Sequence, residues 1–220
     1  MKRVFAIALA AALLCGVLLT LFACTGEAEI IEPSVGETIE FGGITWLVLE
    51  VQDGRALLLS EHLIIEGHAY HWTFTEITWE HSDIRAWLNK EFLDRFSAED
   101  RARIAQTTVV NNNNPWVDTP GGNDTTDYIF LLSLEEVVRY FGDSGQLHNR
   151  PNQDIWLIDD QYNNARFTRD AEGMTRFWWL RSPGGDPDSA AGVTDGGPVH
   201  LGGDRVDRNN GIRPALWLYL

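Results

Sequence analysis

Apolar and polar positions after residue 36 predict an antiparallel meander at the start of the folded part. Apolar and β-branched residues fill three short runs: Thr38 to Phe41, Ile44 to Val51 and Ala56 to Ser60. Gly42-Gly43 and Asp53-Gly54 separate these runs with the residue types that tight hairpins need. We therefore expect three consecutive strands joined by short turns.

A helical pattern follows between residues 83 and 96. Ser82 is suited to be its N-cap, and Asp83 favours the positive end of the helix dipole. Five apolar residues recur at helical spacing on one face: Ile84, Trp87, Leu88, Phe92 and Phe96. This is the clearest helix of the sequence.

Two capping-box patterns predict two further helices. Ser97 with Asp100 indicates a short helix that ends near residue 105, and Ser133 with Glu136 indicates a helix up to residue 141. Gly142 is the residue type that ends such a helix.

The rest of the chain alternates polar segments with short strands. Asn111 to Asp127 is a long polar loop, and loops of this length in compact domains are usually functional or disordered. Apolar runs separated by glycine and asparagine turns predict the remaining strands: Thr107 to Val110, Asp127 to Leu132, Ile155 to Ile158, Phe177 to Leu180, Ala190 to Thr194, Pro198 to Leu201, Arg205 to Asp207 and Ile212 to Leu218. We expect a single α+β domain with a mostly antiparallel twisted sheet and two or three helices.

The first two dozen residues have the pattern of an export signal. Lys2 and Arg3 precede an apolar run, and Cys24 follows the small residue Ala23. This arrangement resembles the lipobox of bacterial lipoproteins, whose cysteine is lipidated and becomes the mature N-terminus. Phe22 is bulkier than that motif usually carries, so free secretion and an uncleaved membrane span stay open as alternatives. All three place the folded part outside the cytoplasm.

We therefore expect a signal peptide over residues 1–23, a lipidated N-terminus and tether over 24–36, and an extracellular domain over 37–220. Cys24 is the expected lipidation site, and the membrane is contacted through this anchor on its outer face. The other cysteine, Cys15, lies within the apolar run, so no disulfide stabilises the domain.

Charge narrows the range of partners. Removal of residues 1–23 takes away two of the 17 basic side chains and none of the 32 acidic ones, which leaves a formal charge of −17. Such a surface repels phosphate backbones, and we expect no nucleic-acid partner.

Five blocks of sequence stand in order along the chain: Ile44–Leu49 (ITWLVL), Ser82–Asn89 (SDIRAWLN), Asp127–Ser133 (DYIFLLS), Trp178–Gly184 (WWLRSPG) and Gly211–Leu218 (GIRPALWL). Over about residues 36–220 they resemble the bacterial family called domain of unknown function 6273. The resemblance implies an extracellular or surface protein and no established reaction.

The closing blocks also resemble, more faintly, the C-type-lectin-like fold of formylglycine-generating enzymes. This second resemblance implies a C-type-lectin-like outline. Those oxidases use cysteine chemistry, and the domain has no cysteine beyond Cys24. Their reaction is therefore excluded, whereas a binding module on the same scaffold remains open.

Neither zinc chemistry nor hydrolysis has a specific motif here. Four histidines fall within twenty residues: His62, His68, His71 and His81. Zinc needs three or four converging ligands, and this segment has the pattern of strand and loop, so we favour surface or structural histidines. Among 32 acidic residues a chance carboxylate pair is uninformative, and Pro183 after Ser182 removes an oxyanion-hole N–H. We assign no catalytic residue and no metal ligand.

Oxygen-bearing side chains collect in the C-terminal turns: Asp186, Asp188, Asp195, Asp204, Asp207, Asn209 and Asn210. Tight turns require these residue types in any case, and no EF-hand loop is present. We expect no cofactor, with calcium as an open alternative.

Aromatic and basic residues of the C-terminal blocks are further candidates. Trp178 and Trp179 are adjacent and point to opposite faces of a strand, so one ring is expected in the core and the other on the surface, where it could stack on a sugar. Arg181 and Arg213 are expected to anchor turns through carboxylates such as that of Asp195, with ligand binding as a second role.

The expected function is a non-enzymatic module that binds an envelope glycan or an extracellular protein. Loops on a rigid scaffold carry recognition, so the 111–127 loop and the C-terminal turns are the expected contact surface. The candidate ligand-binding residues are Trp116, Asp124, Trp179, Arg181, Asp195, Asp204, Asn209 and Arg213. A cell-envelope hydrolase that uses an Asp/Glu pair or the histidine cluster is the alternative, and a structural scaffold is a third hypothesis.

Overall fold

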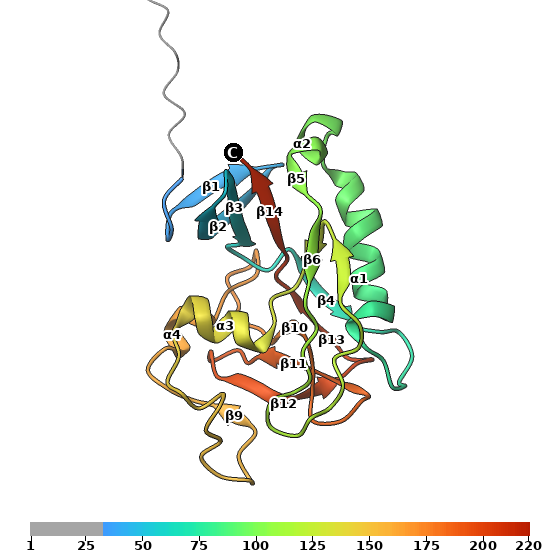
Figure 1. The fold of residues 1–220 in the computed structure, drawn as a ribbon, viewed down its shortest axis with the longest axis vertical. Helices are drawn as coiled ribbons and strands as arrows, with labels where there is room; N and C mark the ends of the chain where they lie inside the picture. The colour runs from blue at the N-terminus through green and yellow to red at the C-terminus, as the bar shows by residue number, and fades with distance from the viewer. Residues whose placement is uncertain (1–32) are drawn as a thin grey trace, which may run out of the picture. The chain divides into compact units, whose positions relative to one another are not determined.

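The computed structural model describes residues 33–220 (Figure 1). The predicted signal peptide, the lipidation of Cys24 and most of the 24–36 tether lie outside the described residues. Residues 33–220 form one compact unit that is built mostly of antiparallel sheet.

The first sheet joins the N-terminal meander to the C-terminal strand. Its strand order is β1-β2-β3-β14-β5, and β8 also pairs with β14. The strands are β1 (Thr38–Phe41), β2 (Ile44–Gln52), β3 (Arg55–Ser60), β5 (Ile104–Ala105), β8 (Ile129–Phe130) and β14 (Ala215–Tyr219). The predicted meander is confirmed, and β14 adds to its open edge by pairing with β3.

The second sheet has the order β4-β13-β10-β11-β12-β9. Its strands are β4 (Ile65–Ala69), β9 (Leu157–Ile158), β10 (Trp178–Pro183), β11 (Ser189–Val193), β12 (Val199–Arg205) and β13 (Asn209–Ile212). Among the described strands, β10 and β13 form the one parallel pair. A small third sheet pairs β6 (Thr107–Val109) with β7 (Thr125–Asp127) at the base of the long loop.

The prediction that Asn209-Asn210-Gly211 is a turn is wrong. These residues belong to β13, which pairs with β4, because an available strand edge outweighs the local preference of asparagine and glycine for turns. Arg213 and Pro214 then carry the chain from β13 in the second sheet to β14 in the first. Likewise, the two strands predicted around residues 198–207 are the single strand β12.

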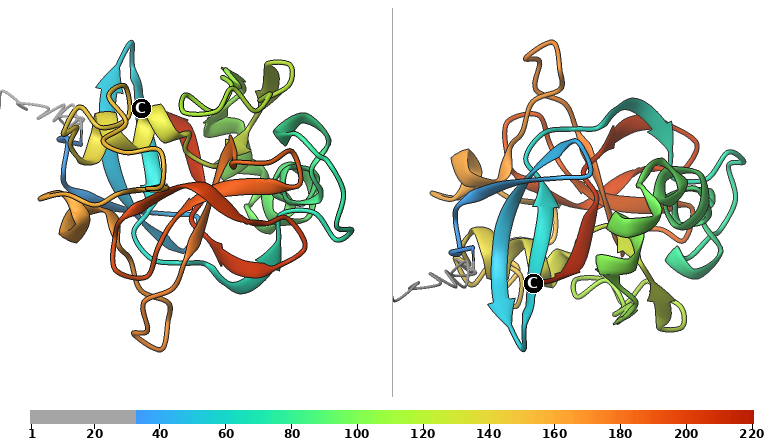
Figure 2. Two further views of the ribbon diagram at one scale, coloured as in Figure 1. Left: turned by 90° about the horizontal axis from the view of Figure 1, so that it is seen from below. Right: turned by 90° about the horizontal axis from the view of Figure 1, so that it is seen from above.

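Four short α-helices are present in the described chain, one or two more than expected. They are α1 (Asp83–Trp87), α2 (Ala98–Arg103), α3 (Leu134–Phe141) and α4 (Asn163–Arg166). The predicted caps are confirmed: the side chains of Ser82, Ser97 and Ser133 each accept a hydrogen bond from the backbone three residues on. Figure 2 shows α1 and α3 on different sides of the strands.

The helix predicted over residues 83–96 changes its winding twice. A π-helical turn, η2 (Leu88–Phe92), follows α1, and a 3₁₀ turn, η3 (Leu93–Arg95), ends it. Another 3₁₀ turn, η1 (Trp79–His81), precedes α1. The side-chain amide of Asn89 donates to the Arg85 carbonyl, the acceptor that an α-helix would assign to the Asn89 backbone N–H, and it also bonds the backbone of residues 128 and 129. This link to the sheet accounts for the wider turn.

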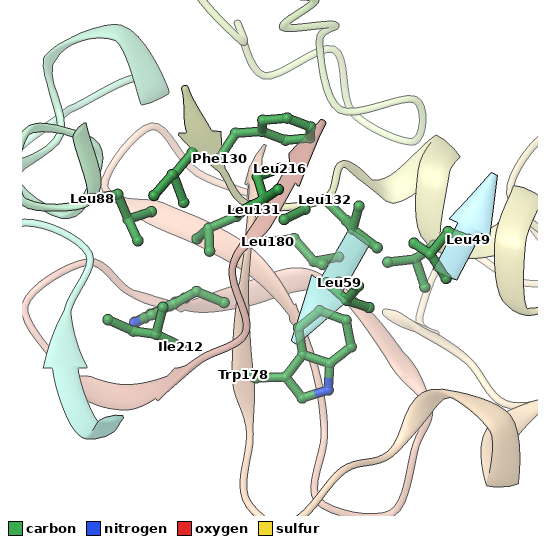
Figure 3. Close-up of a cluster of buried hydrophobic side chains, with 14 of the residues drawn as sticks. Leu49, Leu59, Leu88, Phe130, Leu131, Leu132, Trp178, Leu180, Ile212 and Leu216 are labelled. Carbon is green, nitrogen blue, oxygen red and sulfur yellow. The ribbon is translucent and has the colours of Figure 1, made fainter. Parts of the chain in front are cut away.

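The core lies where β3, β10, β14 and the segment after β8 meet. Figure 3 shows Leu59, Trp178, Leu180 and Leu216 converging there. Both Trp178 and Trp179 are 0% exposed, so the prediction that one of these two rings faces outward is wrong. All six residues of β10 are buried, so both faces of this strand are covered. No helix within residues 33–220 combines the length and apolar character that crossing a membrane demands.

Candidate functional site

A hollow of about 630 Å³ opens beside the ends of β4, β10 and β13. We call it the polar pocket. Ligand pockets in proteins typically have volumes of roughly 300–1,000 Å³, so this hollow is large enough for a small molecule. Its lining is formed by Gly67, Thr175, Arg176, Phe177, Thr194, Asp195, Asn209, Asn210 and Gly211.

The polar pocket combines several hydrogen-bonding groups with one aromatic ring. Asn209 and Asn210 bring amides that both donate and accept, and Thr175 and Thr194 bring hydroxyl groups. Asp195 contributes an exposed carboxylate, and Phe177 is half-buried. Together these groups suit a ligand that has many hydroxyl groups and an apolar face.

Glycines fix the position of the aromatic ring and of one wall. A Cβ at Gly192 would lie 2.1 Å from the Cζ of Phe177, so the ring packs directly on the backbone of β11. Phe177 also meets Trp179 edge to face, with ring centroids 5.4 Å apart. Gly67 has a φ of 79°, and a Cβ there would lie 3.3 Å from the Cβ of Asn209. The ring and the amide are therefore held by rigid strands.

A hairpin held by Asp170 supports the wall that carries residues 175–177. Its carboxylate accepts hydrogen bonds from the backbone N–H groups of Glu172 and Met174 and from the Arg176 side chain. The Arg176 guanidinium, followed by these backbone bonds, holds the pKa of Asp170 below its usual range even though burial opposes the shift. The wall of the polar pocket thus depends on an ionised carboxylate.

Two of the predicted ligand-binding residues, Asp195 and Asn209, line the polar pocket. Asp204 lies behind it and accepts a hydrogen bond of 3.0 Å from the Asn210 amide. The Asp204 carboxylate therefore positions the side chain of Asn210, which lines the pocket.

The two candidates from the 111–127 loop lie elsewhere. The Trp116 indole N–H donates to the carbonyls of Gln146 and Leu147, and the Asp124 carboxylate accepts the backbone N–H of Asn111. Both side chains hold the loop in place. Pro120 of this loop lines a separate hollow of about 270 Å³ beside η1. The loop and the polar pocket do not form one contact surface.

Trp179 and Arg181 are buried structural residues. The Trp179 indole donates to the His68 carbonyl. Arg181 is 4% exposed and bonds the Glu136 carboxylate and the carbonyls of Val110 and Leu131, so the prediction that it anchors a turn through a carboxylate such as that of Asp195 is wrong. Burial favours the nearest carboxylate and carbonyls because a desolvated guanidinium needs partners in direct contact.

Arg213 lines a third, smaller cavity. This arginine cavity has a volume of about 260 Å³ and is lined by Leu47, Glu61, His62, Phe167, Thr168, Arg169 and Arg213. It shares no lining residue with the polar pocket. Arg213 does not anchor a turn through a carboxylate of residues 33–220, contrary to expectation; its Nε donates to the Ser60 carbonyl instead.

The histidine cluster does not converge. His68 is buried between Trp72 and Trp87, His71 lies 2.7 Å from the Asp83 carboxylate, and His62 lines the arginine cavity. Among the side chains that the structure describes, which within residues 33–220 leave out those of 65 and 66, no three histidine, cysteine or acidic groups gather as a metal site would require. Calcium stays an untested alternative.

Sequence reasoning missed most of the pocket's lining, including Phe177, Arg176 and Gly67. Residue type alone does not reveal them, because they come together only through the pairing of β13 with β4 and β10. The one signal in the sequence is the polar run Asp207–Asn210 before Gly211, whose residue types favour a turn.

A family model described as domain of unknown function, DUF6273, matches residues 53–220 of this chain. No curated protein and no solved structure is significantly similar to this chain.

Proposed function

This chain belongs to the DUF6273 family, and we propose that it is a non-enzymatic surface module whose polar pocket binds a carbohydrate of the cell envelope. The observation that carries the proposal is the composition of the pocket: two asparagine amides, two threonine hydroxyls and a carboxylate around the half-buried ring of Phe177. Sugar hydroxyl groups need paired donors and acceptors, and the C–H face of a sugar ring packs on an aromatic ring.

The same lining favours binding over hydrolysis. Glycoside hydrolysis generally requires two carboxyl groups that flank the scissile bond. Of the described residues that line the polar pocket, only Asp195 has a carboxylate. A C-type-lectin-like outline is part of the same proposal, and the glycine-rich hairpins between β10 and β12 support it.

A glycan array probed with the full chain in a polyoxyethylene detergent tests this function. We expect retention of a limited set of glycans and at least a tenfold loss of affinity in Asp195→Ala, because the variant loses a charge-assisted hydrogen bond. The matched control is Asp154→Ala, which removes another exposed carboxylate, one outside the pocket lining. Recovery of a protein partner without glycan retention, or equal binding by both variants, would contradict the proposal.

We further propose that Cys24 is lipidated after removal of residues 1–23 and holds the domain on the outer face of the cell membrane. The basic start, apolar run and small residue before Cys24 support this proposal. Mass spectrometry of the chain purified from membranes should find the diacylglycerol on Cys24, and Cys24→Ala should leave the chain unprocessed. An intact, unmodified chain in the cytosol would contradict it.

A further inference from the structure

Three arginines are buried in the described chain, and they differ in their partners. Arg166 is 0% exposed and lies 2.9 Å from the Asp160 carboxylate, and Arg181 is 4% exposed and pairs with Glu136. Arg213 is equally buried, at 4% exposed, yet no carboxylate within residues 33–220 lies within 4.0 Å of it. Its charge is the uncompensated one of the three.

Few groups around Arg213 compensate for its burial. Its Nε donates to the Ser60 carbonyl at 2.8 Å, whereas Nη1 is buried without a hydrogen-bond partner. Its guanidinium carbon lies 5.3 Å from the ring centroid of Trp178 and 5.4 Å from that of Phe141. Burial lowers the pKa of Arg213 to about 9, and the charge of Glu61 opposes this shift. The side chain is therefore still a cation at neutral pH.

Burying a cation without a partner costs free energy, so a buried cation in a protein is normally paired with a counter-ion. Arg213 is also part of the wall of the arginine cavity, so a ligand can approach it. Arg169 adds a second cationic side chain to the same lining, and Leu47 and Phe167 add apolar surface. Glu61 is the one carboxylate among the lining residues and disfavours a strongly charged anion there.

We propose that the arginine cavity binds a small organic monocarboxylate, with the carboxylate group on the Arg213 guanidinium and the apolar part against Leu47 and Phe167. This inference goes beyond the proposed carbohydrate function and concerns a separate site. A carboxylate accepts the hydrogen bonds that the arginine nitrogens lack, and it carries only a single negative charge opposite Glu61.

The test uses butyrate and its neutral isostere butyramide as probes in an NMR titration of the full chain in a polyoxyethylene detergent. We expect saturable shifts of the Trp178 indole signal with butyrate, and binding at least tenfold weaker with butyramide. Inorganic phosphate, a large part of which is a dianion at neutral pH, should also bind more weakly than butyrate because of Glu61.

Variants locate the site. Arg213→Gln should weaken butyrate binding at least tenfold. A substitution of this buried residue can prevent folding. If Arg213→Gln does not fold, two milder variants test the site: Arg169→Gln should weaken butyrate binding two- to fivefold, and Glu61→Gln should strengthen it. The matched control Arg208→Gln removes an exposed arginine outside the cavity and should leave binding unchanged.

Equal affinity for butyrate and butyramide, no binding of either, or wild-type affinity in Arg169→Gln would overturn the proposal. Carbohydrate binding at the polar pocket is measured with different probes and different variants. The failure of one proposal therefore leaves the other standing.

Discussion

The 111–127 loop and residues 184–211 have similar compositions, rich in asparagine, aspartate and glycine, but the fold uses the two segments differently. In the loop, the Asn114 side-chain amide is 1% exposed and donates to the carbonyls of Pro183, Gly184 and Leu201. In the C-terminal part, Asn209 is exposed, lines the polar pocket and makes no side-chain hydrogen bond within the described residues. The same residue type serves folding in one segment and is available for a ligand in the other.

The surroundings of each segment explain this difference. The loop lies beside β10 and β12, where the Asn114 amide donates to the carbonyls of Pro183 and Leu201 and the Thr119 hydroxyl donates to the carbonyl of Gly185. Asn209 and Asn210 belong to β13, whose backbone groups are paired with β4, so their side chains are not needed for this purpose. A polar segment is thus available for recognition only where the backbone beside it is already satisfied.

The largest expected effect is the loss of stability in Asn114→Ala. The variant leaves several buried carbonyls without a donor, and we expect a fall of about 2–4 kcal/mol in the free energy of unfolding. Asn112→Ala is the matched control from the same asparagine run; its side chain is exposed, and the change should stay within about 0.5 kcal/mol. Chemical denaturation of both variants measures the difference, and equal stabilities would show that the loop does not hold the sheet.

Local patterns in the sequence predicted much of the fold but little of the site. The meander, the serine caps and the Ser133–Glu136 capping box depend on neighbouring residues, so the sequence indicates them directly. The strand at β13 and the burial of both Trp178 and Trp179 depend on pairing between distant segments. Asp195 and Asn209 stand out by residue type, whereas the position of the Phe177 ring depends on its packing against Gly192, which is distant in sequence.

A second prediction concerns Asn209→Ala, which should show the opposite behaviour to Asn114→Ala. The free energy of unfolding should change by no more than about 0.5 kcal/mol, because the Asn209 side chain is exposed. Affinity for the retained glycan should fall about tenfold, equivalent to about 1.4 kcal/mol. Calorimetric titration and denaturation of the same preparation give both values. A stability loss comparable with that of Asn114→Ala would remove the distinction between the two segments.

The smallest expected effect is a pH dependence of the stability difference between a variant and the wild type. Asp170→Asn should show this dependence, and Asn114→Ala should not. The pKa of Asp170 is lowered in the folded chain from its ordinary value of 3.8, so its contribution to stability is present above that value and is lost as pH falls through the lower, folded pKa. Between about pH 6 and about pH 3, the difference in melting temperature between the wild type and Asp170→Asn should therefore shrink. The hydrogen bonds of the Asn114 amide do not titrate, so the deficit of Asn114→Ala should stay constant over the same range. If the Asp170→Asn difference is also independent of pH, the wall of the polar pocket does not depend on the ionised carboxylate.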